Sequence, residues 1–150
     1  MGTLSETQAT RGPLPCSLSI WTGYLLTRAA QQCRSHFDRL IEPFGINGRH
    51  FTVLTVLGEG NPLSQVEIGD RLGIDRNTIV LLLDDLQEQG LAVRERDPQD
   101  RRAHLVSLTD SGRDVLAAGT EMARRTNDEV FSPLSSEERK HLHTLLKRLF

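Results

Sequence analysis

Residues 64–90 read SQVEIGDRLGIDRNTIVLLLDDLQEQG, and this stretch predicts two short helices joined by a tight turn. Ser64 and Glu67 have the spacing of a capping box that begins the first helix, and Gly73 marks its end. Asp75 is a suitable cap for the second helix, which runs to Gly90. Two capped helices joined by LGID are typical of a helix-turn-helix, although the spacing alone also fits an ordinary helical hairpin.

The second helix has one apolar face and one face of mixed character. On a helical wheel, an i, i+3, i+4, i+7 stripe is expected to face the core, and it consists of Ile79, Leu82, Leu83 and Leu86. The opposite face holds Asn77, Leu81, Asp84 and Glu88, with Arg76 and Val80 on the flank. Packing therefore accounts for most of the apolar run, while Leu81 is left on the outer face.

A β-hairpin is predicted directly after this helix pair. Residues 91–96 and 104–108 alternate between apolar and polar side chains, and Asp97-Pro98-Gln99-Asp100 between them is typical of a turn. From Arg94 to Arg102 four arginines face three acids, a net charge of +4 − 3 = +1. A hairpin in this place is a wing, and it favours the helix-turn-helix over the helical hairpin.

The flanking segments are predicted to be helical beyond a flexible tail at residues 1–17. A long helix is expected from Leu18 to about Pro43, and the threefold spacing of Phe51, Leu54 and Leu57 favours a helix over a strand at residues 50–58. Thr109 is expected to cap a helix to about residue 131, and SSEE at 135–138 is a second capping box that begins a terminal helix. The predicted class is mainly α with a small β-hairpin wing (α+β).

Composition places limits on function. A net charge of −2 over 150 residues offers no overall basic footprint, so any case for nucleic acid must be local. There is no phosphate-binding glycine loop, HExxH motif or histidine pair at metal-ligand spacing, so we expect neither an enzyme nor a metal or other cofactor. Two cysteines and no signal-like or membrane-spanning segment are typical of a cytoplasmic protein without a membrane partner.

From Leu18 onward the order of elements resembles the MarR family of dimeric winged helix-turn-helix transcriptional regulators. The resemblance is carried by IGDRLGIDRNT, by LQEQGLAVRERDPQDRRAHLVSLTDSG and by the terminal SSEERKHLHTLLKRL. It implies a homodimer that binds double-stranded DNA, with dimerisation helices at residues 18–48 and 109–150 around a DNA-binding lobe at 49–108. We expect a repressor of a pseudo-palindromic operator, relieved by a small-molecule effector.

The resemblance also implies which residues contact DNA. The second helix would enter the major groove, and Arg102 of the wing would enter the minor groove, with Arg101 nearer a phosphate and Asp100 orienting a neighbouring arginine. The expected DNA-binding residues are Ser64, Gln65, Arg76, Asn77, Thr78, Val80, Leu81, Arg94, Arg96, Asp100, Arg101 and Arg102. Asn can bind adenine in a bidentate manner, and Val or Leu can contact a thymine methyl group.

Three positions depart from the family pattern, which more often has a hydroxyl residue near 80, arginine near 81 and a basic residue near 85. Here they are Val80, Leu81 and Asp85, so phosphate and wing contacts are expected to dominate a modest affinity. A winged-helix module that binds a protein through Val80, Leu81, Asp84 and Asp85 is the alternative from another functional class.

Regulation could use a ligand or a thiol. By resemblance, a small aromatic or phenolic effector would bind near Trp21, His36, Arg39 and His50, although single Trp or His residues are more often core or surface. Oxidation of Cys16 or Cys33 is the other route considered, and neither cysteine has a nearby resolving partner in the sequence.

Overall fold

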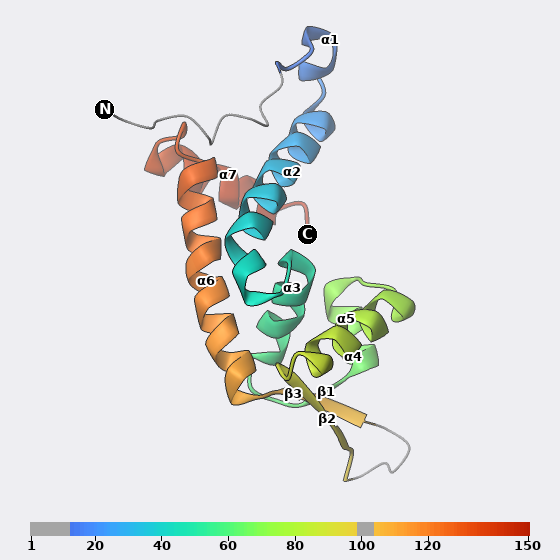
Figure 1. Ribbon diagram of the computed structural model, residues 1–150. Coiled ribbons are helices and arrows are strands. Elements are labelled where there is room, and N and C mark those ends of the chain that lie inside the picture. Colours follow the sequence, from blue (N-terminus) through green and yellow to red (C-terminus); the bar gives the residue numbers. More distant parts are fainter. Residues whose placement is uncertain (1–12, 99–103) are drawn as a thin grey trace, which may run out of the picture. The chain divides into compact units, whose positions relative to one another are not determined.

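The computed structural model describes residues 13–98 and 104–150 (Figure 1). They form two compact units: residues 13–36 with 127–150, and residues 37–126 apart from 99–103. The helices are α1 (Cys16–Ser19), α2 (Thr22–Ile41), a 3-10 turn η1 (Glu42–Phe44), α3 (Gly48–Leu57), α4 (Gln65–Leu72), α5 (Arg76–Glu88), α6 (Asp110–Val130) and α7 (Ser136–Lys147). The strands are β1 (Leu63–Ser64), β2 (Ala92–Arg96) and β3 (His104–Leu108).

Helices α4 and α5 form the predicted helix-turn-helix. The Ser64 hydroxyl accepts from the Glu67 backbone N–H, and the Glu67 carboxylate accepts from the Ser64 backbone N–H, so the capping box is complete. Gly73 ends α4 with a φ of 62°, a left-handed conformation that glycine adopts without a Cβ penalty. Asp75 then caps α5 by accepting from the backbone N–H groups of Asn77 and Thr78.

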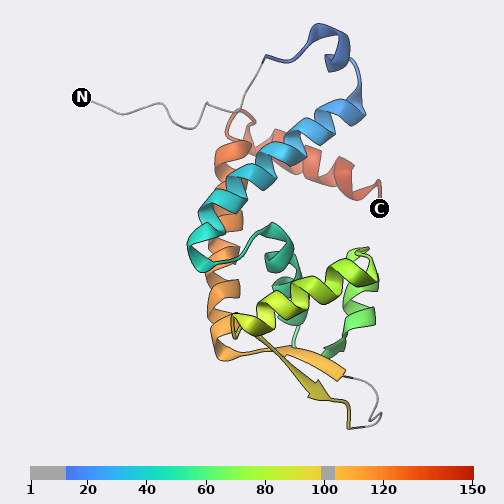
Figure 2. The ribbon, with the colours of Figure 1, turned by 45° about the vertical axis from the view of Figure 1, so that its right-hand side comes forward.

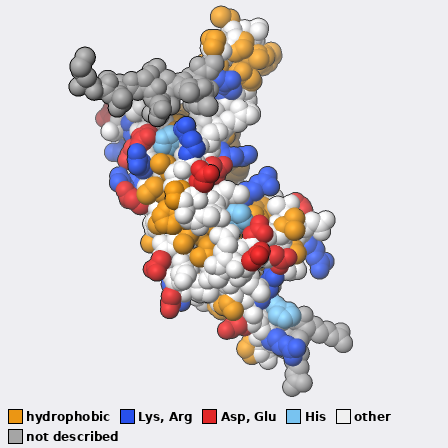
Figure 3. Space-filling view, viewed as in Figure 1, with side chains coloured by type: hydrophobic (Ala, Val, Ile, Leu, Met, Phe, Trp, Pro, Cys, Tyr) orange, Lys and Arg blue, Asp and Glu red, His pale blue; other side chains and the backbone are white. Residues whose placement is uncertain are grey.

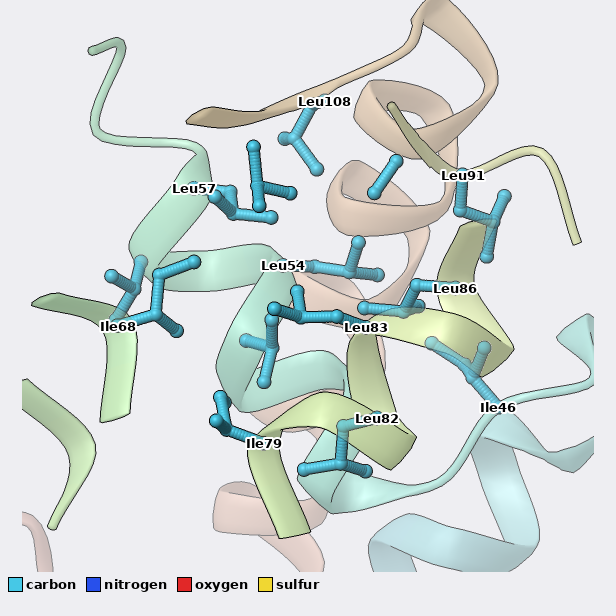
Figure 4. Packing of buried hydrophobic residues seen from close by; sticks show 14 of the residues in the cluster. Ile46, Leu54, Leu57, Ile68, Ile79, Leu82, Leu83, Leu86, Leu91 and Leu108 are labelled. Carbon is cyan, nitrogen blue, oxygen red and sulfur yellow. The ribbon is translucent and has the colours of Figure 1, made fainter. Parts of the chain in front are cut away.

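The apolar stripe of α5 is the centre of the core of the 37–126 unit. Ile79, Leu82, Leu83 and Leu86 are all at most 6% exposed, as the helical wheel predicted. They pack with Leu54 and Leu57 of α3, Ile68 of α4, Leu91 and Leu108 (Figure 4). Because this stripe is buried, the opposite face of α5 is the one directed away from the core.

A three-stranded antiparallel sheet has the strand order β1-β3-β2. Strand β1 precedes α4 in the chain, whereas β2 and β3, the olive and orange arrows of Figure 2, follow α5. The predicted hairpin is present as β2 and β3, with Arg94 opposite Val106 and Arg96 opposite His104. The third strand, β1, pairs Leu63 with Val106 and was not predicted. Two residues are too few to show alternation, and their strand character depends on a partner more than 40 positions away.

The long helix expected from Leu18 to about Pro43 is present as α2, but its start differs from the prediction. Helix α1 begins at Cys16, after Pro15, and ends at Ser19, and α2 begins only at Thr22. No residue of α1 is buried and Ile20 is 72% exposed, so within residues 13–98 and 104–150 no packing holds the segment in one long helix. The 3-10 turn with Pro43 and Gly45, whose φ is 73°, ends the α2 segment as expected.

The remaining helices follow their predicted caps. The Thr109 hydroxyl accepts from the Gly112 N–H at the start of α6, and Ser135 and Glu138 form the capping box of α7. The mainly helical fold with a small β wing is therefore confirmed. In residues 13–98 and 104–150 no helix is long and apolar enough to cross a membrane, and no group of three His, Cys, Asp or Glu side chains is placed to hold a metal ion.

Candidate nucleic-acid interface

The N-terminal half of α5 presents three side chains to solvent. Arg76 and Asn77 are exposed, and Leu81, one helical turn further along, is 64% exposed. Thr78 and Val80 are half-buried beside them, and the Thr78 hydroxyl donates to the Asp75 carboxylate at 2.6 Å. A cation, an amide and an apolar side chain therefore share the outer surface at the helix start, the part of such a helix that usually reaches base edges.

The start of α4 adds two half-buried side chains, Ser64 and Gln65. The Ser64 hydroxyl also donates to the Glu67 carboxylate at 2.7 Å, so it is already used within the capping box. These bonds lower the pKa of Glu67, chiefly through the Ser64 backbone N–H and then its hydroxyl. The pKa of Asp75 is lowered by the Thr78 hydroxyl first and by the Thr78 backbone N–H next. Both carboxylates thus act in helix capping.

Acidification should destabilise the helix-turn-helix through these two caps. Because their pKa values are lower in the folded protein, the carboxylates contribute stability above their ordinary values of 4.5 and 3.8. That contribution is lost as pH falls through the lower, folded-state values. Urea unfolding between about pH 6 and about pH 3 should show the loss. Glu67→Gln, which can keep a capping box, should have a shallower pH dependence, and an unchanged one would contradict this account.

The two wing arginines within the described residues have different surroundings. The guanidinium of Arg94 on β2 donates to the Asp84 carboxylate of α5 and, at 3.3 Å, to the Gln87 side chain. Arg96 is exposed to solvent and lies opposite His104 on β3, which is also exposed. Asp100, Arg101 and Arg102 lie outside the described residues. Arg94 is therefore joined to the helix, whereas Arg96 is available at the surface.

The two adjacent acids of α5 contact neighbouring elements in different directions. Asp84 accepts from Arg94, and the Asp85 carboxylate oxygen Oδ2 lies 3.3 Å from Nε2 of His50 on α3. Sequence patterns missed both pairs because the partners are 10 and 35 positions away. The only hint was the acid at position 85, where the family resemblance favours a basic residue. Both carboxylates are therefore paired within the 37–126 unit, while 51% of the Asp84 side chain and 56% of the Asp85 side chain remain exposed.

The proposed effector residues fall in both units. In the 13–36 and 127–150 unit, Trp21 is 62% exposed, and Nε2 of the buried His36 lies 2.9 Å from the Glu129 carboxylate. In the 37–126 unit, Arg39 is exposed and His50 is buried. Both histidines therefore have a carboxylate neighbour within their own unit.

The two cysteines proposed for redox sensing differ in their exposure to solvent. Cys16 is exposed and Cys33 is half-buried. Burial raises the pKa of the Cys33 thiol, which lowers the fraction of reactive thiolate at neutral pH.

Comparison with known proteins identifies the relatives of this fold. The sequence of residues 44–103 matches a protein-family model whose description is MarR family. CouR, a transcriptional repressor solved bound to a 23-mer DNA duplex, is 35% identical, with a TM-score of 0.83 over 92% of this chain and 99% of CouR. The chain belongs to the MarR family.

Two further solved structures place this MarR-family chain among regulators. A Pseudomonas aeruginosa protein described as a probable transcriptional regulator is 34% identical, with a TM-score of 0.82 over 89% of this chain and 99% of that one. PcaV, a regulator of Streptomyces coelicolor solved with its natural ligand, is 28% identical, with a TM-score of 0.78 over 93% and 96% of the two chains. The chain is accordingly a transcriptional regulator with a winged helix-turn-helix, and not an enzyme.

Proposed function

We propose that this MarR-family chain is a homodimeric, sequence-specific DNA-binding repressor. The observation that carries the proposal is the exposure of Arg76, Asn77 and Leu81 at the start of α5, while the apolar stripe of the same helix is buried. CouR, a repressor that binds duplex DNA, supports it by its similarity over nearly the whole chain. In this proposal α5 enters the major groove with Asn77 toward a base edge and Leu81 toward a thymine methyl group.

The charge of α5 is compatible with this placement. Residues 76–88 sum to +1 − 3 = −2, counting Arg76 against Asp84, Asp85 and Glu88. Asp84 is offset by Arg94, so the surface of the helix is less acidic than the count suggests. Arg96 would add a phosphate contact, and Arg101 and Arg102 would add the wing contacts that the family resemblance implies.

A second copy of the chain is the expected partner of the 13–36 and 127–150 unit. Helix α7 has no buried residue in this chain, and Ile20, Trp21 and Leu149 are each more than 60% exposed. Orange, hydrophobic side chains gather over α1 in Figure 3. A hollow of about 590 Å³ between the end of α6 and α7 includes Phe131, Leu142 and Leu146 in its lining. Burial of these apolar surfaces by a partner would hold two α5 helices for two half-sites.

A small aromatic or phenolic acid is proposed as the effector that relieves repression. PcaV, solved with its natural ligand, supports the existence of a ligand-binding site in this fold. The candidate residues remain Trp21, His36, Arg39 and His50. An effector would act by binding one arrangement of the dimer better than another. Operator affinity measured with and without a panel of hydroxylated aromatic acids tests this part of the proposal.

Selection of duplexes from random DNA at controlled salt tests the proposed function directly. A homodimeric repressor should enrich an inverted repeat whose half-sites are about one helical turn apart. No enriched sequence would overturn the DNA-binding proposal and favour the protein-interaction module.

The affinity for the selected duplex should depend steeply on salt. Each phosphate neutralised by a cation contributes about −0.9 to the slope of log K against log salt concentration. If Arg76, Arg96, Arg101 and Arg102 in each half of a dimer neutralise eight phosphates in total, the slope should be about −7. Fluorescence anisotropy over a salt series measures the slope, and a value near zero would rule out binding through phosphates.

A further inference from the structure

His50 lies at the N-terminal end of α3 with both ring nitrogens in polar contacts. Its Nδ1 accepts from the Asn47 backbone N–H at 3.3 Å, while the Asn47 side chain accepts from the backbone N–H groups of Arg49 and His50. This is a capping box in which an imidazole stands in the position where Glu or Gln is usual. The ring is thereby held at the helix start, and His50 as a whole is only 7% exposed.

The second ring nitrogen extends the capping box to α5. Because Nδ1 accepts a hydrogen bond, the neutral ring has its proton on Nε2, which donates to Oδ2 of Asp85 at 3.3 Å. The His50 side chain is 9% exposed and that of Asp85 is 56% exposed. One imidazole therefore joins the start of α3 to the C-terminal half of α5.

The start of α3 is itself attached to the end of α2. The Gly48 backbone N–H donates to the Asp38 carboxylate at 2.7 Å. A Cβ at Gly48 would lie 3.2 Å from that carboxylate, so the two segments approach closely. Hydrogen bonds thus run from Asp38 through the α3 capping box to His50 and Asp85, all within the 37–126 unit.

We propose that His50 and Asp85 are a positioning pair that sets the orientation of α5 for DNA binding. The inference rests on the proposed function and adds a role for an acid that simple electrostatics would disfavour. A carboxylate on a helix that approaches phosphates weakens binding by repulsion. Asp85 offsets that cost because it holds the helix against α3, and His50 acts through Asp85 without contacting DNA.

The direction in which Asp85→Ala changes the affinity for DNA tests the proposed pair. Asp85→Ala removes both a negative charge and the acceptor for Nε2, and it should weaken binding to the selected duplex about fivefold, the equivalent of one hydrogen bond. Glu88→Ala is the matched control, because Glu88 is an exposed acid on the same helix. This control should leave binding unchanged or tighten it, since only repulsion is removed.

Two further variants separate positioning from folding. Asp85→Asn keeps an oxygen acceptor for His50 and should bind at least as tightly as the wild-type protein. His50→Gln can keep the α3 capping box while losing the contact with Asp85, so it should weaken binding about as much as Asp85→Ala, or about fivefold. The double variant should be no weaker than either single variant, because both remove the same contact.

Anisotropy titrations of the full chain with the selected duplex, alongside urea unfolding, decide the outcome. Weaker binding by Asp85→Ala, restored by Asp85→Asn, supports the pair. Tighter binding by Asp85→Ala, additive effects in the double variant, or an effect on unfolding alone would overturn it while leaving the proposed function intact. No binding by the wild-type protein would instead overturn the proposed function, together with this inference that depends on it.

Discussion

Replacing Leu81 with Asp should weaken DNA binding by at least about thirtyfold, or about 2 kcal/mol, because it places a negative charge where α5 is proposed to meet the groove. Leu81 is 64% exposed, so the substitution creates no buried charge. The free energy of unfolding should therefore change by only about 0.5 kcal/mol or less. Anisotropy with the selected duplex measures the loss, and urea unfolding measures the stability.

A charge series at position 81 provides the control. Leu81→Asn has nearly the shape of the aspartate variant without its charge, and Leu81→Arg supplies the cation that the family pattern favours. Affinity should rise in the order Asp, Asn, Arg if this surface lies in the negative potential of the DNA groove. Equal affinities across the three variants would show that Leu81 lies away from DNA.

Gly112→Ala should lower the free energy of unfolding by about 3 kcal/mol or more, near the upper end of the cost of overpacking. Gly112 lies in the first turn of α6, and a Cβ there would be 1.9 Å from the Leu91 carbonyl oxygen. The Leu91 carbonyl belongs to the backbone that joins α5 to β2, and the Leu91 N–H donates to the Leu86 carbonyl at 2.8 Å. This backbone cannot move away from a Cβ at position 112 without disturbing the end of α5. Urea unfolding at a fixed protein concentration measures the effect.

Gly23→Ala is the matched control for that substitution. Gly23 also lies near the start of a helix, but in the part of the chain that the structure describes no heavy atom outside its own turn lies within 4 Å of a Cβ there. Alanine should leave the stability unchanged or raise it slightly, since it favours the helical conformation. A loss of stability at Gly23 as large as at Gly112 would show that steric contact with Leu91 is not the cause.

The helix-turn-helix was predictable because its signals are local. Capping residues such as Ser64 and Asp75 act on backbone groups two or three positions away, and Gly73 adopts its left-handed conformation within the turn itself. The apolar spacing of Ile79, Leu82, Leu83 and Leu86 also lies within one helix. These features therefore identified the inner and outer faces of α5, and with them the exposed residues Arg76, Asn77 and Leu81.

Other features depended on partners that no local pattern identifies. Strand β1 exists because Leu63 pairs with Val106, and the break before α2 lies beside α1, which has no buried residue, and the exposed Ile20. The glycine at 112 belonged to the family motif, but the reason for it is the approach of the Leu91 carbonyl. Each of these features could be recognised only from the distances in space between segments that are remote in sequence.

The acids of α5 show most clearly the difference between what the local sequence determines and what only the tertiary structure reveals. The sequence alone determined that RNTIVLLLDDL forms a helix with a buried leucine-rich stripe, because a period of 3.6 residues assigns side chains to faces. It left Asp84 and Asp85 as unexplained negative charges. Only the tertiary structure decided that Asp84 pairs with Arg94 and Asp85 with His50, because an ion pair or hydrogen bond depends on a few ångströms in space and not on distance along the chain.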